Sequence, residues 1–508
     1  MSKATAPEAG RRLSYRYRIY PTPEQEEQMR YTLAGCKFVY NYFLRARIDA
    51  YERTQTELRR PEIVLDETGE PKLDNNGREV WRRDDDDKIV YTTVPNENYD
   101  PTAKPLTRFD TTKMLTQLKN SLADKDDGHL WLNDLDAVAL NYALIHLDHA
   151  YQNFFRGIKK GQKIGFPKFK NRKNPMCAYT TKVQLVGHDA AGKRVAEKKA
   201  IPSDIASDPK LADVTWTHVY VPKLGDVKAK VHRLPQGTFV AASISTDSAG
   251  RWFCSLNVKE ADDLPKTHAA GSVGITFGAS RWVTDSTGET TNMPEGMRRR
   301  YKRKIRAQRD LSRMVKGSNN WKKQKKKLAR IEASIADCRR NATHDLTHRY
   351  VSEYDTICTR EMQSKEMAQH KSGATEKLPR RVQHHLNRLV MDNNFFEVNR
   401  QLAYKADWNR RAFALVPCDT PTAQVCNDCG YKETLLINDL RPTWTCPACG
   451  TRHDRKHNGA DNVLEAGLDI LNEQALAYVT KEREATRKKT AAKRAAKKKN
   501  GSSAPATN

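Results

Sequence analysis

The sequence CNDCG at residues 426–430 and the sequence CPACG at residues 446–450 stand shortly before DRKHN at residues 454–458. Each CxxC pair can present two thiolates to one ion, and four thiolates complete a closed tetrahedral shell around Zn²⁺. The spacing favours such a site over a redox pair of dithiols. Because the shell leaves no open position, the metal is expected to be structural rather than catalytic. The predicted ligands are Cys426, Cys429, Cys446 and Cys449.

The composition points to a polyanionic partner. The chain has 508 residues and a net charge of +27 at pH 7, with a pI near 9.6. Such an excess indicates nucleic acid or an anionic membrane, and the length predicts about two to four domains. No run of 18 apolar residues is present and residues 1–12 lack an apolar segment, so we expect neither a membrane span nor a secretory signal. A cytoplasmic protein with reduced thiols follows.

Two segments concentrate the positive charge. Residues 481–499 contain ten Lys or Arg residues and two Glu residues, and we expect residues 481–508 to form a disordered basic tail. Residues 298–330 contain sixteen Lys or Arg residues against one acid, Asp310. A solvated helix face is the ordinary interpretation, but this excess favours contact with phosphates. The candidates there are Arg298, Arg299, Arg300, Lys302, Arg303, Lys304, Lys322, Lys323, Lys325 and Lys326.

A third basic segment, residues 165–173, alternates aromatic residues and cations in the sequence GFPKFKNRK. This pattern suits contact with a phosphate backbone and stacking against bases. A basic turn with buried Phe side chains is an equally good interpretation. The candidate contacts are Lys168, Lys170, Arg172 and Lys173.

Periodicity predicts the main elements. Residues 15–19 alternate as in a strand, Pro23 suits the first turn of a helix, and residues 111–158 carry an apolar stripe typical of helices. Residues 179–258 indicate short strands of a β-rich region. We expect polar insertions at residues 52–106 and 188–211. A second domain begins near residue 273, and its predicted elements are helices within 297–353, a strand at 356–358, and helices at 396–408 and 457–479.

Taken with the cysteine pairs, several segments resemble the TnpB family of transposon-encoded, RNA-guided nucleases, which are related to type V CRISPR effectors. These segments are YRIYPTPEQ at residues 17–25, GFPKF at 165–169, YTT at 179–181, KGSNN at 316–320 and QLAYKA at 401–406. The resemblance implies a multidomain α/β protein: a wedge β-barrel, a helical recognition region, and a RuvC-like RNase H fold that holds a zinc ribbon. The implied parts are 11–20 and 161–264 for the barrel, 21–160 for the helical region, 271–416 and 453–480 for the RuvC-like domain, and 417–452 for the ribbon.

In the family that this chain resembles, an Asp, a Glu and an Asp hold two Mg²⁺ ions. The corresponding residues here are Thr276 in GITFG at residues 274–278, Glu361, and Lys456 in DRKHN. A hydroxyl and an ammonium cannot replace two carboxylates as ligands of divalent cations. We therefore expect no catalytic Mg²⁺ and no enzymatic activity. The alternative is that a displaced carboxylate, Asp285, Asp454 or Asp461, serves instead.

The resemblance and these substitutions predict an RNA-guided DNA-binding protein that does not cleave DNA. Its expected partners are a guide RNA and a double-stranded DNA target, and it would block transcription or recruit another protein, such as part of the transcription machinery. We expect a monomer associated with the nucleoid of a prokaryotic cell. Two alternatives remain open: a Mg²⁺-dependent nuclease with displaced carboxylates, and a guide-free zinc-ribbon protein that binds nucleic acid.

Overall fold

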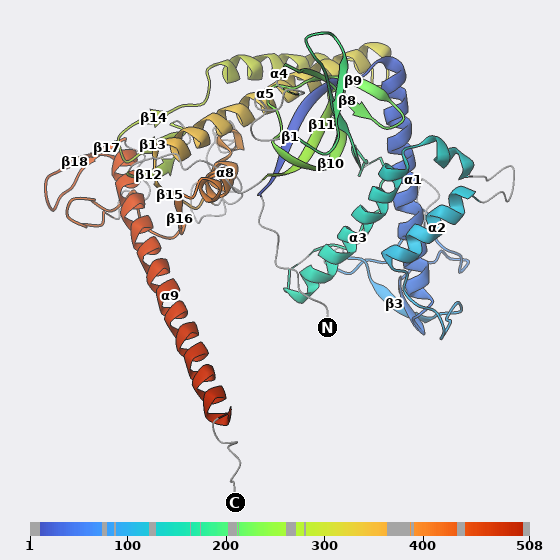
Figure 1. Ribbon diagram of the computed structural model, residues 1–508. Coiled ribbons are helices and arrows are strands. Elements are labelled where there is room, and N and C mark those ends of the chain that lie inside the picture. Colours follow the sequence, from blue (N-terminus) through green and yellow to red (C-terminus); the bar gives the residue numbers. More distant parts are fainter. Residues whose placement is uncertain are drawn as a thin grey trace, which may run out of the picture. The chain divides into compact units, whose positions relative to one another are not determined.

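The chain forms two compact units, Met1–Asp262 and Asp263–Asn508 (Figure 1). The structure is a computed structural model. It describes residues 11–73, 79–85, 88–120, 129–162, 164–172, 174–201, 211, 213–260, 271–278, 281–362, 387, 391–433 and 442–500. Within this part of the chain, no helix combines the length and apolar character needed to cross a bilayer.

The first unit is built on a nine-stranded sheet in which β1 lies between β9 and β11 (Figure 1). Segments far apart in the sequence are thus joined, because the first strand pairs antiparallel with β9 and with β11. The expected strand at residues 15–19 and the β-rich region at 179–258 are confirmed. The strands are β1 (Arg11–Tyr20), β4 (Ala178–Thr181), β5 (Gln184–His188), β6 (Arg194–Glu197), β7 (Ala200–Ile201), β8 (Thr215–Val221), β9 (Gly225–Lys230), β10 (Gly237–Thr246) and β11 (Trp252–Glu260).

Three helices accompany this sheet. They are α1 (Pro23–Glu52), α2 (Arg108–Asn120) and α3 (Ala137–Lys159), with a short 3₁₀ helix at His129–Asp134. Helix α1 starts at a capping box, in which Thr22 Oγ1 accepts from the Gln25 amide and Gln25 Oε1 accepts from the Thr22 amide. Apolar side chains of α1 and α3 share one core with the sheet, including Met29, Leu140 and Trp252.

The predicted insertion at residues 52–106 differs from a plain loop. It contains an antiparallel pair, β2 (Glu57–Pro61) and β3 (Tyr91–Pro95). Isolated β-bridges within the segment that connects β2 and β3, such as the one between Ile63 and Trp81, add further antiparallel pairing. The polar composition concealed this hairpin because both strands are largely exposed and lack an apolar alternation. Of the insertion predicted at 188–211, the structure describes β6 and β7, whereas residues 202–210 lie outside the described residues.

The second unit contains a five-stranded mixed sheet in the order β14-β13-β12-β15-β16. Strands β12, β13 and β14 pair antiparallel, and β15 and β16 extend the sheet in parallel from β12. The bounds are β12 (Ser272–Phe277), β13 (Val283–Asp285), β14 (Thr290–Thr291), β15 (Thr356–Arg360) and β16 (Ala412–Val416). The expected strand at residues 356–358 is therefore confirmed.

Helices cover both faces of this second sheet. The helices are α4 (Gly296–Ser312), α5 (Asn319–Glu353), α8 (Phe395–Trp408) and α9 (Arg455–Asn500). Alternate residues of β12, Val273 and Ile275, pack with side chains of α5 and α8. On the other face α9 approaches so closely that a Cβ on Gly274 would lie 2.1 Å from the Ala460 carbonyl oxygen. Glycine at this position thus permits α9 to pack against β12.

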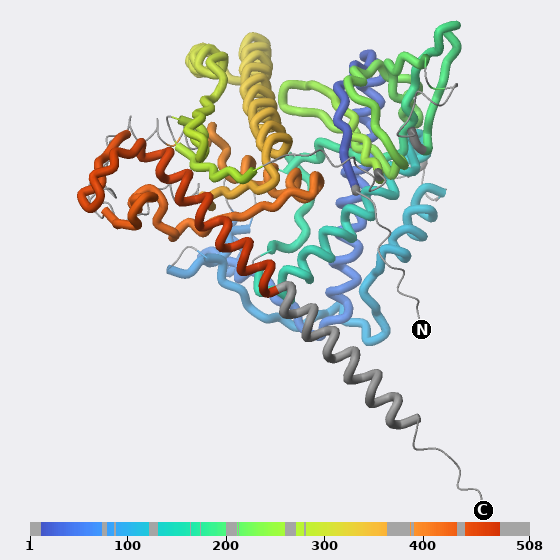
Figure 2. The backbone as a smooth tube through the Cα atoms, turned by 60° about the vertical axis from the view of Figure 1, so that its left-hand side comes forward, coloured from blue at the N-terminus to red at the C-terminus, as the bar shows by residue number. Residues whose placement is uncertain are grey.

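Two helices differ from expectation in detail. The predicted helical region 297–353 is divided into α4 and α5, which run side by side (Figure 2). They are separated at Gly317, whose φ of +92° favours glycine, and Ser318 then caps α5. The tail predicted to be disordered continues α9 as a helix to Asn500, which agrees with the helix propensity of Ala, Lys and Arg. Residues 501–508 lie outside the described residues.

A candidate metal centre and a basic cavity

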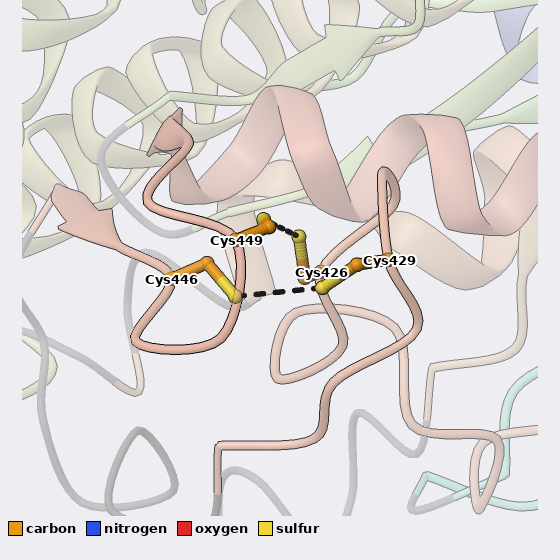
Figure 3. A group of neighbouring side chains, drawn as sticks. All are labelled: Cys426, Cys429, Cys446 and Cys449. Atoms are coloured by element: carbon orange, nitrogen blue, oxygen red, sulfur yellow. Dashed lines mark hydrogen bonds between the residues drawn. The ribbon is translucent and has the colours of Figure 1, made fainter.

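The four predicted cysteines come together in the second unit (Figure 3). We call Cys426, Cys429, Cys446 and Cys449 the cysteine cluster, and their ligand atoms all lie within 4.8 Å of one another. The Sγ atoms of Cys426 and Cys449 are 3.6 Å apart, as are those of Cys429 and Cys446. A Zn–S bond of about 2.3 Å requires tetrahedral S–S edges of about 3.8 Å. The arrangement therefore fits one Zn²⁺ ion held by four thiolates.

The two halves of the cluster share one backbone design. The amide of Gly430 donates to the Cys426 carbonyl at 2.9 Å, and the amide of Gly450 donates to the Cys446 carbonyl at 2.8 Å. Both glycines adopt positive φ, +74° and +78°, which residues with a Cβ rarely do. Each turn thus holds its two thiols at a fixed spacing. Cys449 Sγ and Thr451 Oγ1 are hydrogen-bonded at 3.4 Å. This contact is the largest cause that lowers the pKa of Cys449 to about 6, and a low pKa favours the thiolate that a metal needs.

His453 is a polar neighbour of the cluster that the sequence reasoning missed. Its Nε2 lies 3.1 Å from Cys426 Sγ, and its ring packs against Trp444. Cys426, Asp428 and His453 form a second group of potential ligand atoms. Since a closed shell already uses four sulfurs, His453 is placed to donate a hydrogen bond to the Cys426 thiolate. His453 lies on β18 (Arg452–Asp454), which pairs with β17 (Thr443–Thr445). The sequence could have indicated this neighbour, because His453 follows the last CxxC cysteine by only four residues.

Two buried asparagines connect the cluster to the start of α9. Asn458 Oδ1 accepts from the Asn427 amide at 3.0 Å, and its Nδ2 donates to the Val425 carbonyl at 2.7 Å. Asn462 Nδ2 donates to the carbonyls of Thr422 and Val425 at 2.7 and 2.8 Å. Neighbouring backbone groups of the first CxxC turn are therefore fixed to the first turns of α9.

Thr276 and Lys456, which are distant in sequence, do meet in the structure. Thr276 Oγ1 lies 3.2 Å from both the Thr284 and the Lys456 carbonyl oxygens, and it has one hydrogen to donate between them. The Lys456 ammonium donates to the Phe277 carbonyl at 2.8 Å. Burial, followed by the charges of nearby arginines, lowers the pKa of Lys456 to about 8.

These residues border a cavity of about 180 Å³, which we call the basic cavity. Three cations line it, Arg360, Arg455 and Lys456. Among the described residues, the lining contains no Asp or Glu. The other lining residues are Thr276, Phe277, Gly278, Met362, Phe395, Thr422, Ala423 and Gly459. Arg360 was missed from the sequence, although it directly precedes Glu361.

The third predicted position, Glu361, follows the last residue of β15. Its amide donates to the Val416 carbonyl at 2.8 Å, its side chain is exposed, and it does not line the cavity. The strand register explains this placement. Ile275 pairs with Thr359, so one step further along the two parallel strands Thr276 is level with Arg360, and their side chains share one face.

The three alternative carboxylates have other contacts. Asp285 is buried and accepts from the Tyr350 hydroxyl at 2.8 Å. Asp454 is bound by Arg281 at 2.8 Å and caps the start of α9 through the Lys456 amide. Asp461 Oδ2 lies 3.8 Å from His457 Nε2. Although burial raises the pKa of Asp454, hydrogen bonds from Arg281 and backbone amides outweigh it and lower the pKa overall.

Most of the predicted cations on α4 and α5 are exposed, and we call the exposed ones the α4–α5 basic surface. Its members are Arg298, Arg299, Lys302, Arg303, Lys322, Lys323, Lys325 and Lys326. Two further candidates are half-buried and bound within the unit. Arg300 donates to Ser334 Oγ at 3.0 Å, and Lys304 forms an ion pair with Glu332 at 3.0 Å.

The predicted basic loop belongs to the first unit and combines both of its interpretations. Lys168 and Arg172 are exposed, whereas Lys170 is half-buried with its ammonium over the Tyr40 ring. Phe166 packs edge-on against Tyr151 yet keeps 43% of its surface exposed. Lys173 lies outside the described residues. The loop is therefore partly anchored and partly available for contact.

Three family profiles match the chain. The profile described as "Probable transposase" matches residues 255–371, and the "Helix-turn-helix domain" of the same transposase group matches residues 11–56. The "Cas12f1-like, TNB domain" matches residues 395–463, which hold the cysteine cluster and the start of α9. Residues 11–56 form β1 and the single helix α1, so the helix-turn-helix of that description is not the local fold. The matches make parts of the chain similar to a transposase group and to a Cas12f1-like domain.

Two relatives are similar over most of their length. A protein of Streptomyces pristinaespiralis, with the name "Putative RNA-guided DNA endonuclease", is 29% identical over a stretch that covers 90% of this chain and 89% of that protein. An Escherichia coli protein, with the name "Putative RNA-guided DNA endonuclease InsQ", is 29% identical over a stretch that covers 74% of this chain and 84% of that protein. Together with the profile matches, these relatives support the resemblance of the chain to the TnpB family.

Solved structures give weaker likenesses. The protein in a structure entitled "Cryo-EM structure of the Cas12f1-sgRNA-target DNA complex" aligns with 89% of this chain and 98% of its own, at 10% identity and a TM-score of 0.42. A CRISPR-Cas_phi3 mini-RNA-guided endonuclease aligns with 90% of this chain and 92% of its own, at 9% identity and a TM-score of 0.32. The family assignment rests on the sequence matches.

The relatives' names contradict one prediction. From Thr276 and Lys456 we expected that the protein is not an enzyme, but both relatives are named as endonucleases, and one aligns with 90% of this chain. The prediction treated two positions as decisive. A metal site depends on carboxylates that are close in space, whichever elements carry them. Glu361 and Asp454 remain at the ends of elements next to the basic cavity.

Proposed function

We propose that this protein targets DNA under the direction of a guide RNA. The two relatives are named for RNA-guided action on DNA, and the observation that carries the proposal to this chain is the α4–α5 basic surface. A row of exposed cations binds phosphates without regard to sequence. Sequence recognition then comes from base pairing between the guide RNA and one DNA strand. The protein would contact the backbone of that RNA–DNA duplex.

The arrangement of the second unit supports a RuvC-like RNase H fold with an inserted zinc ribbon. Its mixed sheet has three antiparallel strands followed by two parallel ones, with helices on both faces. The cysteine cluster interrupts the sequence between β16 and α9. Zn²⁺ bound there would stabilise the turns that Asn458 and Asn462 fix to α9, because a closed thiolate shell contributes directly to folding.

Bound to its target, such a protein would occlude the DNA. At a promoter this occlusion would lower transcription, and at another locus the bound protein could present a surface to a recruited partner. These consequences require stable binding, to which the α4–α5 basic surface contributes. We propose that the protein acts as a monomer that associates with chromosomal DNA through its guide.

Cleavage of the bound DNA is the second candidate function. It comes from the names of the two relatives. The observation that favours it here is that two carboxylates lie at the ends of elements of the second unit: Glu361 directly follows β15 and is exposed, and Asp454 ends β18 directly before α9. A nuclease that uses Mg²⁺ needs such carboxylates. Loss of plasmid cleavage in Glu361→Ala, with cleavage by the unaltered protein in Mg²⁺, would establish this function.

The first test of guide-directed targeting is sequencing of the RNA that copurifies with the protein from its native locus. We expect one structured RNA with a defined variable end. Duplex DNA that matches this end should be retained by the protein, whereas a scrambled duplex should not. RNA of many unrelated sequences, or none, would contradict the proposal and favour guide-free binding with a steep dependence on salt.

A further inference from the structure

The lining of the basic cavity is positively charged. Arg360, Arg455 and Lys456 line it, and the described part of the lining contributes no carboxylate. Asp454, which directly precedes Arg455, is already bound by Arg281 at 2.8 Å, and Glu361, beside Arg360, is exposed and does not line the cavity. A site in the interior that gathers cations in this way attracts an anion.

Arg360 contributes a guanidinium that is held by neutral groups. Its Nη1 donates to Thr422 Oγ1 at 3.3 Å and its Nη2 to the Cys418 carbonyl at 2.6 Å. Its Nε is buried and has no hydrogen-bond partner among the described residues. An unmatched buried donor costs free energy, and an oxyanion within reach would remove that cost.

Lys456 has donor capacity left over. One hydrogen of its ammonium goes to the Phe277 carbonyl, 2.8 Å away, and an ammonium carries three. The described residues offer it no ion pair. The first turn of α9 begins beside it, at Arg455, so the positive end of the helix adds to the field in the cavity.

We propose that the basic cavity binds one phosphate of a nucleic-acid strand directly, through Lys456 and Arg360, without a bridging divalent ion. The cavity of about 180 Å³ is large enough for this group. For comparison, an apolar cavity of about 150 Å³ in another protein admits benzene. Thr276 and Gly278, which also line the cavity, leave room for the oxygens because neither side chain is large. This binding requires neither a guide nor base pairing.

The test measures how readily single lysines react. The full-length protein in EDTA is labelled with trace acetic anhydride, with inorganic phosphate or with NaCl at equal ionic strength, and the modified lysines are quantified by mass spectrometry. We expect phosphate to lower acetylation of Lys456 at least threefold. Lys405 is the internal control, because its pKa is also lowered to about 8 but its ammonium is bound by the His344 carbonyl and Thr347 Oγ1.

Unchanged labelling of Lys456, or equal protection of Lys456 and Lys405, would overturn the proposal. A second arm replaces phosphate with a short single-stranded oligonucleotide. If the oligonucleotide protects Lys456 at a far lower concentration of phosphate groups than inorganic phosphate requires, the ligand is a nucleic-acid strand. If only inorganic phosphate protects Lys456, the assignment of a nucleic-acid strand is wrong. In Lys456→Gln, the rise in Tm that phosphate produces in the unaltered protein should disappear. No guide or duplex is used, so failure here is distinguishable from failure of guide-directed targeting.

Discussion

The cysteine cluster and the basic cavity both involve residues in the first turns of α9, Asn458 and Lys456, yet their chemistry suits opposite kinds of ligand. The cluster gathers four sulfurs that suit a cation. The cavity gathers three cations that suit an anion. Two neighbouring sites that share one helix start can therefore differ in the charge of the ligand that their side chains suit.

Loss of one ligand of the cysteine cluster should have a severe effect on stability. Cys446→Ser should abolish stoichiometric zinc and destabilise the second unit by at least 5 kcal/mol, because apparent zinc affinities of structural sites reach about 10–16 kcal/mol. Zinc per chain is measured by elemental analysis, and stability by urea unfolding. Cys177→Ser is the matched control, since Cys177 is an exposed free thiol outside the cluster. Equal zinc in both variants would contradict the metal assignment.

A four-residue substitution distinguishes binding at the basic cavity from binding at the α4–α5 basic surface. Replacing Lys322, Lys323, Lys325 and Lys326 by Gln should reduce the salt dependence of nucleic-acid binding by about 3 in log–log slope and weaken binding about 100-fold at moderate salt. Fluorescence anisotropy against salt concentration measures both quantities. Phosphate protection of Lys456 should remain unchanged. If that protection is also lost, the cavity is not an independent site.

The link between the two regions is tested at Asn458, which is 2% exposed. Asn458→Ala leaves the Asn427 amide and the Val425 carbonyl without this partner, and it should cost about 2–3 kcal/mol of unfolding free energy. Zinc content should remain at one ion per chain, because the substitution removes no ligand. Loss of zinc in this variant would show that the cluster depends on α9 for its assembly.

The smallest effect, and one that depends on pH, is expected at Lys456. Its pKa is lowered to about 8 in the folded protein from 10.5, so the unfolded chain binds more protons between these values and stability rises with pH there. Lys456→Met should therefore stabilise the unit at pH 7 by about 2 kcal/mol, after allowance for the lost hydrogen bond. This gain should vanish near pH 10.5. Urea unfolding at both pH values measures it.

Lys405→Met provides the comparison for that prediction. The Lys405 pKa is lowered to the same extent, but its ammonium donates to two acceptors that methionine would leave unmatched. Its gain at pH 7 should be smaller than that of Lys456→Met. An equal or larger gain would mean that these two hydrogen bonds contribute little and that burial of the ammonium controls stability at both lysines.

The cysteine cluster could be predicted from sequence because its chemistry is local. Two CxxC pairs define the ligands whatever the rest of the fold does. The contact between Thr276 and Lys456 spans 180 residues, and only a family resemblance could suggest it. No local pattern placed Arg360 in the cavity, because that follows from the register of β15 beside β12. The prediction of no enzymatic activity failed for the same reason, since it inferred a spatial property from two positions.

Guide-directed targeting is tested by retention of duplex DNA on the protein with its copurified RNA, in EDTA and in Mg²⁺. We predict that a duplex matching the variable end of the RNA is retained in both conditions about 100-fold better than a scrambled duplex. Equal retention of the two duplexes, or retention that survives removal of the RNA by ribonuclease, would contradict guide-directed targeting.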